Sequence, residues 1–208
     1  MPAPAALLVA LVAASSPRLV DVADRIPDAS VELRYAGTEN LLGRPIYPPG
    51  ARCLLLPAVA DRLAHAADRL RQQGFRLLVY DCYRPLGAQR ALWAAAPIRG
   101  WVADPDHGGS HHNRAAAVDV GLAGRDGAEL PLPTPFDAIG DPHARAFAHG
   151  VPAAARQNRD RLRTAMEAEG FRVNPYEWWH FDAPEAKGAP LLDLPLVRKP
   201  RAGAGAPR

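Results

Sequence analysis

The sequence predicts an α+β fold in which helices pack on a small, mainly antiparallel sheet. Helical and strand-like segments follow one another without the strict alternation of strand and helix that indicates a parallel sheet. The 208 residues, 48% of them hydrophobic, are enough to bury one core. The 22 prolines and 17 glycines predict many turns and irregular loops.

The first half of the chain predicts a helix, a strand and a second helix. Residues 57–73 fit an amphipathic helix because apolar side chains form one stripe, at Val59, Leu63, Ala66 and Leu70. Gly74 suits the position just past the end of that helix. Residues 75–81 are a short apolar run typical of a buried strand, and residues 86–96 predict the second helix.

The second half predicts three strands and one long helix. Residues 116–122 are apolar apart from Asp119, so we expect a buried strand with one inward carboxylate. Residues 156–169 predict a helix that Gly170 ends. Residues 171–173 and 177–181 predict two strands on either side of an Asn-Pro turn.

The ends differ in composition from a central domain that we place at residues 17–197. Residues 1–16 are small and apolar but lack the basic start of a secretory signal. They predict either a signal peptide, which places the protein in the periplasm or outside the cell, or a disordered extension of a cytoplasmic protein. Residues 198–208 predict a disordered basic tail.

Charge and hydropathy exclude two classes of partner. Four of the 25 basic residues lie in the tail, so the excess over 22 acidic residues does not indicate a nucleic-acid surface. No apolar run approaches the roughly 20 residues that span a bilayer. The oligomeric state is open.

Cys53 and Cys82 are too few for a disulfide framework or a four-thiolate zinc site. The sequence favours two buried thiols, because free cysteines are among the most buried residues. A single disulfide between them is the alternative.

Three polar clusters carry the chemistry. The first runs from Ser110 to Asp119 and sets two adjacent histidines before a buried carboxylate. Such a carboxylate is costly unless it is paired or bound to a metal. The second cluster is Glu177-Trp178-Trp179-His180, and the third is Asp81-Cys82-Tyr83-Arg84-Pro85 at the end of a buried strand.

Together these clusters contain what hydrolysis by zinc needs. A catalytic zinc ion takes three nitrogen or oxygen ligands, and a carboxylate that is not a ligand must accept a proton from water. Asp119, His180 and either His111 or His112 supply ligands, and Glu177 supplies the base. Arg84 supplies a cation for the developing oxyanion, although an ion pair with Asp81 would explain it as well.

The chain resembles the D-alanyl-D-alanine dipeptidase family of zinc peptidases, which is related to D,D-carboxypeptidases and to the hedgehog zinc domain. The similarity covers roughly residues 21–194. Besides the three clusters, it rests on Arg34-Tyr35-Ala36, Asn40, Arg52-Cys53, Phe136-Asp137 and Gln157-Asn158-Arg159. Several ordered motifs are far more specific than any one of them.

The resemblance implies an α+β fold with one zinc ion per chain in a cleft. It selects His112, rather than His111, as a ligand beside Asp119 and His180, with Glu177 as general base and Arg84 as transition-state stabiliser. It also implies that Ser110, Tyr35 and Asp137 contact the dipeptide. Trp178 and Trp179 are expected to wall the site.

The sequence departs from the family at Ala115, where glycine is usual. If that position needs a positive φ, alanine there costs roughly 1 kcal/mol or more. A second, smaller departure is Cys82, also at a common glycine position.

The resemblance implies hydrolysis of D-Ala-D-Ala, a dipeptide of the bacterial cell wall. The alternatives are a D,D-carboxypeptidase or an L-alanyl-D-glutamate peptidase acting on peptidoglycan peptides, and a zinc-containing binding module without turnover. Glu177 and Arg84 both favour an enzyme over the binding module.

Overall fold

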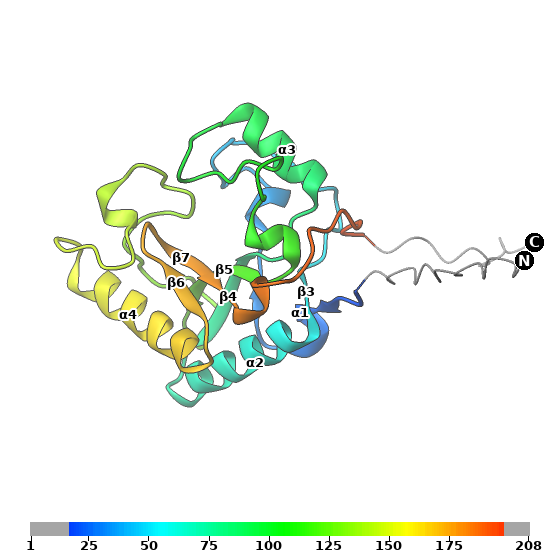
Figure 1. Ribbon diagram of the computed structural model, residues 1–208. Helices are drawn as coiled ribbons and strands as arrows, with labels where there is room; N and C mark the ends of the chain where they lie inside the picture. The colour runs from blue at the N-terminus through cyan, green and yellow to red at the C-terminus, as the bar shows by residue number, and fades with distance from the viewer. Residues whose placement is uncertain (1–16, 198–208) are drawn as a thin grey trace, which may run out of the picture.

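The computed structural model describes residues 17–197 (Figure 1). Its main sheet has five strands in the order β2-β4-β5-β7-β6. These are β2 (Ser30–Val31), β4 (Arg76–Asp81), β5 (Ala117–Ala123), β7 (Glu177–Asp182) and β6 (Arg172–Asn174). Only the pair β2–β4 is parallel, so the prediction of an α+β fold with a mainly antiparallel sheet is confirmed.

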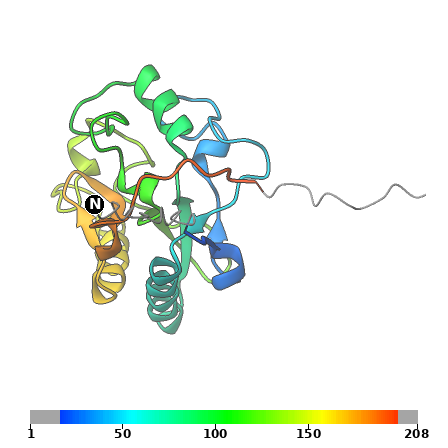
Figure 2. The same cartoon turned by 45° about the vertical axis from the view of Figure 1, so that its right-hand side comes forward.

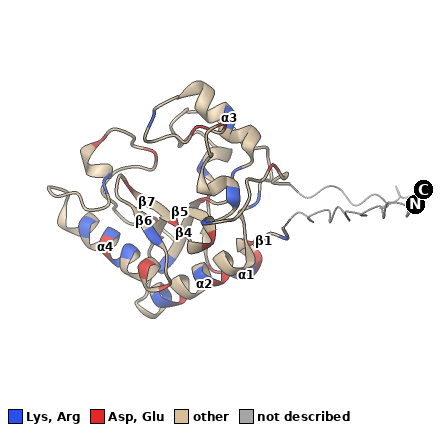
Figure 3. Cartoon of the chain, in the orientation of Figure 1, with Lys and Arg blue, Asp and Glu red and all other residues tan. Residues whose placement is uncertain are grey.

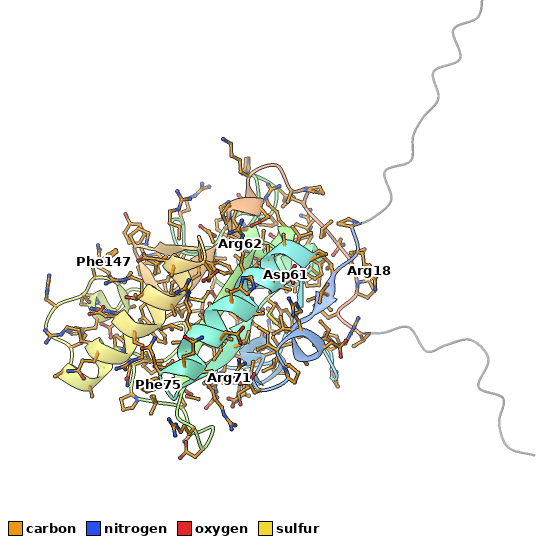
Figure 4. All side chains as sticks on the ribbon, turned by 90° about the horizontal axis from the view of Figure 1, so that it is seen from below. Arg18, Asp61, Arg62, Arg71, Phe75 and Phe147 are labelled. Carbon is orange, nitrogen blue, oxygen red and sulfur yellow. A yellow bond between two sulfur atoms is a disulfide. The ribbon has the colours of Figure 1, made fainter. Side chains whose placement is uncertain are left out.

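Two long helices cover one face of this sheet. They are α2 (Pro57–Gln72) and α4 (Ala153–Ala168), which pack against each other and against β4, β5 and β6. Figure 4, seen from below, shows them side by side under the strands. The predicted apolar stripe of α2 is buried, because Val59, Leu63 and Leu70 have no exposed surface.

The opposite side of the sheet carries irregular segments and α3 (Leu86–Ala95). Figures 1 and 2 show α3 far from α2, with the strands between them. Short 3-10 turns interrupt these segments at Arg34–Ala36 and His111–Arg114, and further ones lie elsewhere in the described chain, at Pro142–Ala144 and Pro184–Ala186. This side is where the polar clusters lie.

A small second sheet joins the start of the described chain to the entry of α2. It pairs β1 (Val20–Asp21) with β3 (Leu54–Leu55), and α1 (Val22–Arg25) follows β1 directly. Among residues 17–197, no helix is long and apolar enough to cross a bilayer. The signal-or-extension prediction for residues 1–16 and the tail predicted at 198–208 lie outside the described residues.

The preference for two buried thiols is wrong, because Cys53 and Cys82 form a disulfide. Cys53 precedes β3 and Cys82 follows β4, and Tyr83 N–H donates to the Leu54 carbonyl at 3.0 Å. This bond aligns the two segments and brings the cysteine Cα atoms to 5.2 Å, within the range that a disulfide needs. Sequence spacing could not reveal the pairing, since it depends on how the two segments align.

Candidate active site

Three candidate metal ligands converge on one point. Asp119 on β5 and His180 on β7 are direct partners across the two strands, and His112 lies in the 3-10 turn before β5. The Asp119 Oδ1 atom is 3.0 Å from His180 Nδ1 and 3.3 Å from His112 Nε2. The two ring nitrogens are 3.1 Å apart.

The turn that carries His112 is held by a capping box. Ser110 Oγ accepts the backbone N–H of His112 at 3.2 Å, and Asn113 Oδ1 accepts the N–H of Ser110 at 2.7 Å. These bonds satisfy the free donors at the start of the turn. Ser110 therefore fixes the backbone of His112, in addition to lining the cleft.

Hydrogen bonds on the far side of each imidazole settle which nitrogen is free. His112 Nδ1 lies 2.6 Å from the Cys82 carbonyl, and His180 Nε2 lies 3.0 Å from Asp182 Oδ1. Because a carbonyl or carboxylate oxygen only accepts, those two nitrogens carry hydrogen. In the neutral rings, the nitrogens that face Asp119 then offer lone pairs.

This arrangement of acceptors fits a divalent cation. All three ligand atoms lie within 4.8 Å of one another. A tetrahedral zinc ion with bonds of about 2.0–2.1 Å would hold its ligand atoms about 3.3 Å apart, close to the separations seen. Two imidazoles and one carboxylate are also a donor set that zinc accepts.

The buried charges of this cluster act strongly on one another. Burial opposes ionisation of Asp119, but His112 and His180 outweigh it and hold the pKa of that carboxyl below its usual range. Burial also opposes the charged form of His180, yet Asp119 and Asp182 raise the pKa of its imidazole well above the usual value. Anionic surroundings that favour a proton favour a metal ion as well, so the two compete.

Asp182 links His180 to the second histidine of the pair. Its Oδ1 atom lies 2.7 Å from His111 Nδ1 as well as 3.0 Å from His180 Nε2. Burial opposes its charge, but hydrogen bonds from His111 and His180 keep the pKa of Asp182 below its usual range. His111 thus lies one step outside the ligand cluster, and carboxylates in the place of Asp182 typically orient metal-bound histidines.

Glu177 is buried beside the ligand cluster without belonging to it. Its Oε2 atom lies 3.9 Å from His180 Nδ1 and accepts a hydrogen bond from Asn174 Nδ2 at 3.0 Å. Burial raises the pKa of Glu177 to about 7, against the opposing charge of His180. A carboxylate with a pKa near 7 suits proton transfer at neutral pH.

Arg84 approaches the cluster from the loop between β4 and α3. Its Nη2 atom lies 3.9 Å from Asp119 Oδ2 and 2.7 Å from Asp81 Oδ2, so the ion pair anticipated with Asp81 is present. Its guanidinium carbon stands 4.6 Å above the ring of Tyr35. Burial opposes its charge, but Tyr35 and Asp81 raise the pKa of Arg84 well above its usual value, so it stays a cation.

Asp137 adds a further carboxylate in a strained loop. It is one of two non-glycine residues with positive φ in the described part of the chain, at 58°. Its Oδ2 atom accepts the Leu41 N–H at 3.0 Å. Burial raises the pKa of Asp137 to about 6, against hydrogen bonds from Leu41 and Tyr35.

These residues surround one cavity of about 220 Å³. All eight candidate site residues line it, namely Tyr35, Arg84, Ser110, His112, Asp119, Asp137, Glu177 and His180. Trp179 lines it too, as expected. Trp178 does not, because its ring lies in the core and its Nε1–H donates to Thr134 at 2.9 Å.

Sequence reasoning missed three polar neighbours of the site. Asp182 could have been found, since it lies two residues after His180 and side chains two apart share a face of a strand. Asn174 and Gln89 give no such signal. Asn174 ends β6 and reaches Glu177 across the β6–β7 turn, and Gln89 on α3 reaches Arg84 in the loop before that helix.

A model of the D-Ala-D-Ala dipeptidase family of peptidases matches residues 15–197. The chain belongs to this family. It is 40% identical to the D-alanyl-D-alanine dipeptidase of Escherichia coli K12 over 176 residues, which cover 84% of this chain and 89% of the relative. It is 32% identical to that of Enterococcus faecium, over 72% of this chain and 83% of the relative.

A third D-alanyl-D-alanine dipeptidase, from Streptomyces coelicolor, is 31% identical over 74% of this chain and 85% of the relative. The resemblance inferred from the sequence motifs is therefore confirmed. As a member of the D-Ala-D-Ala dipeptidase family, the chain is a peptidase, and its family is one of metallopeptidases. The His112–Asp119–His180 cluster is where such an enzyme would hold its metal.

Proposed function

We propose that this protein hydrolyses D-alanyl-D-alanine to two molecules of D-alanine, with one zinc ion held by His112, Asp119 and His180. The convergence of their three lone-pair donors, at separations of 3.0–3.3 Å, is the observation that carries the proposal. When bound there, zinc lowers the pKa of a water molecule from about 15.7 to near 7.

Glu177 and Arg84 have different roles in the reaction. Glu177 accepts a proton from the attacking water and returns it to the leaving amine, for which its raised pKa of about 7 is suited. Arg84 stabilises the negative charge that develops on the carbonyl oxygen of the scissile bond. Its buried cationic guanidinium lies on the cavity wall beside Asp119.

The charged ends of the dipeptide supply selectivity, because its two methyl groups offer little apolar area. Asp137 is positioned to receive the ammonium group in its ionised form, with the hydroxyl of Tyr35 beside it. Ser110 is a further polar contact on the wall. A carboxylate in this place favours a free amino terminus over an acylated one.

Metal analysis combined with an assay of D-alanine release tests this function. We expect about one zinc per chain and hydrolysis of free D-Ala-D-Ala, with the N-acetylated dipeptide rejected. Preferential cleavage of acylated wall peptides would instead indicate a D,D-carboxypeptidase. Binding of the dipeptide without hydrolysis by the zinc-loaded protein would indicate a binding module.

Glu177→Gln separates chemistry from metal binding. The substitution keeps the volume and the hydrogen-bonding capacity but removes the base, so turnover should fall by about 10²-fold or more while zinc content is retained. Substantial remaining activity would exclude Glu177 as the base.

We also infer that the protein works in an oxidising compartment, the periplasm or the medium. The Cys53–Cys82 disulfide supports this, because cytosolic proteins rarely keep structural disulfides. Thiol labelling of the protein in freshly broken source cells would test it. Two free thiols in the native protein would favour a cytoplasmic location.

A further inference from the structure

Gln89 bridges the Arg84 guanidinium and the opposite wall of the cleft. It lies on α3 and has no exposed surface. Its Oε1 atom accepts a hydrogen bond from Arg84 Nη1 at 2.9 Å, and its Nε2 atom donates to the Ala103 carbonyl at 2.7 Å. Ala103 belongs to the segment after α3 that lines the cavity with Trp101 and Val102.

The guanidinium of Arg84 is held on three sides. Asp81 Oδ2 accepts from its Nε at 3.1 Å and from its Nη2 at 2.7 Å, and Tyr47 donates to the other Asp81 oxygen at 2.7 Å. The ring of Tyr35 covers one face. Of the five guanidinium N–H groups, Asp81 and Gln89 occupy three. One N–H remains on each terminal nitrogen.

We propose that Gln89 is a positioning residue of the peptidase reaction, which fixes the Arg84 guanidinium so that its two remaining N–H groups face the carbonyl oxygen of the substrate. The proposal rests on the function proposed above for Arg84. Asp81 alone grips one edge of the guanidinium and leaves Nη1 without a partner. Gln89 accepts the hydrogen bond from Nη1 and, through its own bond to the Ala103 carbonyl, links the guanidinium to the backbone of the cleft wall.

The neutrality of Gln89 matters as much as its shape. A glutamate there would set a second carboxylate against a guanidinium already paired with Asp81, which weakens its attraction for a developing oxyanion. A carboxylate would also face the Ala103 carbonyl without a hydrogen to donate. The amide offers one acceptor and one donor in the two directions required, and leaves the charge of Arg84 unopposed on that side.

Gln89→Met tests the positioning role, since methionine approximates the volume of glutamine and makes neither hydrogen bond. We expect kcat to fall roughly 10- to 100-fold and KM to change less than about threefold, with zinc content unchanged. The matched control is Gln72→Met, an exposed glutamine of α2, which should leave kcat unchanged.

A double-mutant cycle with Arg84→Ala distinguishes positioning from a general structural effect. If Gln89 acts through Arg84, adding Gln89→Met to Arg84→Ala should lower kcat no further. Equal losses of kcat in the two backgrounds would overturn the proposal, since Gln89 would then act on something else.

A measurement that needs no turnover keeps this inference separate from the proposed function. In nitrogen-15 NMR spectra, the signal of the Arg84 Nη1–H group whose hydrogen bond Gln89 accepts should be sharp and protected from solvent exchange in the native protein. It should broaden in Gln89→Met but not in Gln72→Met. An unchanged signal in Gln89→Met would overturn the inference, even if the native protein proved inactive on D-Ala-D-Ala.

Gln89→Glu is the second variant, should loss of both bonds prevent folding. It keeps the acceptor toward Arg84, so the Arg84 signal should remain protected. Its added charge should still lower kcat by about tenfold or more. Retention of the native kcat would contradict the argument that a neutral partner is required.

Discussion

Ala115 holds a left-handed backbone conformation, with φ 53° and ψ 34°, at the end of the turn that carries His112. A residue other than glycine pays about 1–2 kcal/mol for this conformation. The departure from the family glycine therefore falls on a position that does need positive φ. Burial of Ala115 and a hydrogen bond from Leu56 N–H to its carbonyl, 3.1 Å long, hold it there.

Two substitutions at Ala115 should separate backbone strain from packing. Ala115→Gly relieves the strain but loses a buried methyl group and adds freedom to the unfolded chain, so the free energy of unfolding should change by less than about 1 kcal/mol. Ala115→Val adds β-branching and volume where there is no exposed surface, and should cost about 2 kcal/mol or more. Urea unfolding checks both, and equal stability of the Val variant would contradict the explanation.

The two adjacent histidines should respond differently to substitution. His112 is 1% exposed and points Nε2 at Asp119, whereas His111 reaches the cluster only through Asp182. His112→Ala should therefore purify with little zinc, and His111→Ala with about one ion per chain. Zinc analysis of the two proteins in parallel checks this. The reverse pattern would shift the ligand by one residue.

At the scale of elements, periodicity predicted the helices and strands whose polar and apolar side chains form a clear pattern. The stripe of α2 and the apolar run of β4 were placed to within one residue at each end. The start of α4 was placed at residue 156, three residues late, because Ala153, Ala154 and Ala155 offer no alternation of polar and apolar side chains. β2 went unpredicted, since two residues carry no period and only pairing with β4 makes them a strand.

The candidate site was predictable where its residues lie in ordered motifs. His112, Asp119, Glu177 and His180 belong to such motifs, and the pairing of β5 with β7, together with the turn before β5, brings them together. The residues that hydrogen-bond to the site's side chains were not predictable. Gln89 and Asn174 meet their partners only through the placement of α3 and of the β6–β7 turn. A side chain with a common type and no period gives no signal of its tertiary partner.

An ion pair ties α2 to the turn before β2. Arg71 donates to both oxygens of Asp28, at 2.7 Å from Nε and 2.5 Å from Nη2, and is labelled in Figure 4. These bonds lower the pKa of Asp28. Because the folded pKa lies below the unfolded one, the pair stabilises the protein above about pH 4 and loses that effect as the pH falls through the folded pKa.

Asp28→Asn should therefore lower the free energy of unfolding at pH 7, by at most about 1 kcal/mol because the pair is partly exposed. The difference from the native protein should shrink toward about pH 3. Urea unfolding at several pH values measures it, with Gln72→Asn on the same helix as a pH-independent control. A difference that grew with acidity would contradict the assigned direction.

At the scale of the whole molecule, the two sides of the main sheet differ in what they carry. The side covered by α2 and α4 carries the main apolar core, and its outer surface mixes acidic and basic residues, as Figure 3 shows. The other side carries the polar cavity, built from strand ends, turns and loops. Residues far apart in sequence meet there, so the cavity depends on the integrity of the whole fold.

The Cys53–Cys82 disulfide connects the helix-covered side of the sheet to the cavity side. It joins the entry of α2 to the end of β4, and the Cys82 carbonyl accepts the hydrogen bond that orients His112. The bridge spans 29 positions of the chain. Restricting a loop of that length in the unfolded state contributes roughly 3–4 kcal/mol to stability.

Replacing both cysteines by alanine should consequently lower the melting temperature by roughly 10 °C, given 2–4 °C per kcal/mol for a domain of this size. The zinc-loaded and metal-free proteins should both show the loss, because the constraint acts on the unfolded chain. Scanning calorimetry with and without dithiothreitol supplies the control. Reductant should destabilise the native protein to a similar extent and leave the double variant unchanged. If reductant left the melting temperature of the native protein unchanged, the bridge would contribute nothing to stability. Hydrogen bonds such as that of Tyr83 to Leu54 would then suffice to hold the two segments together.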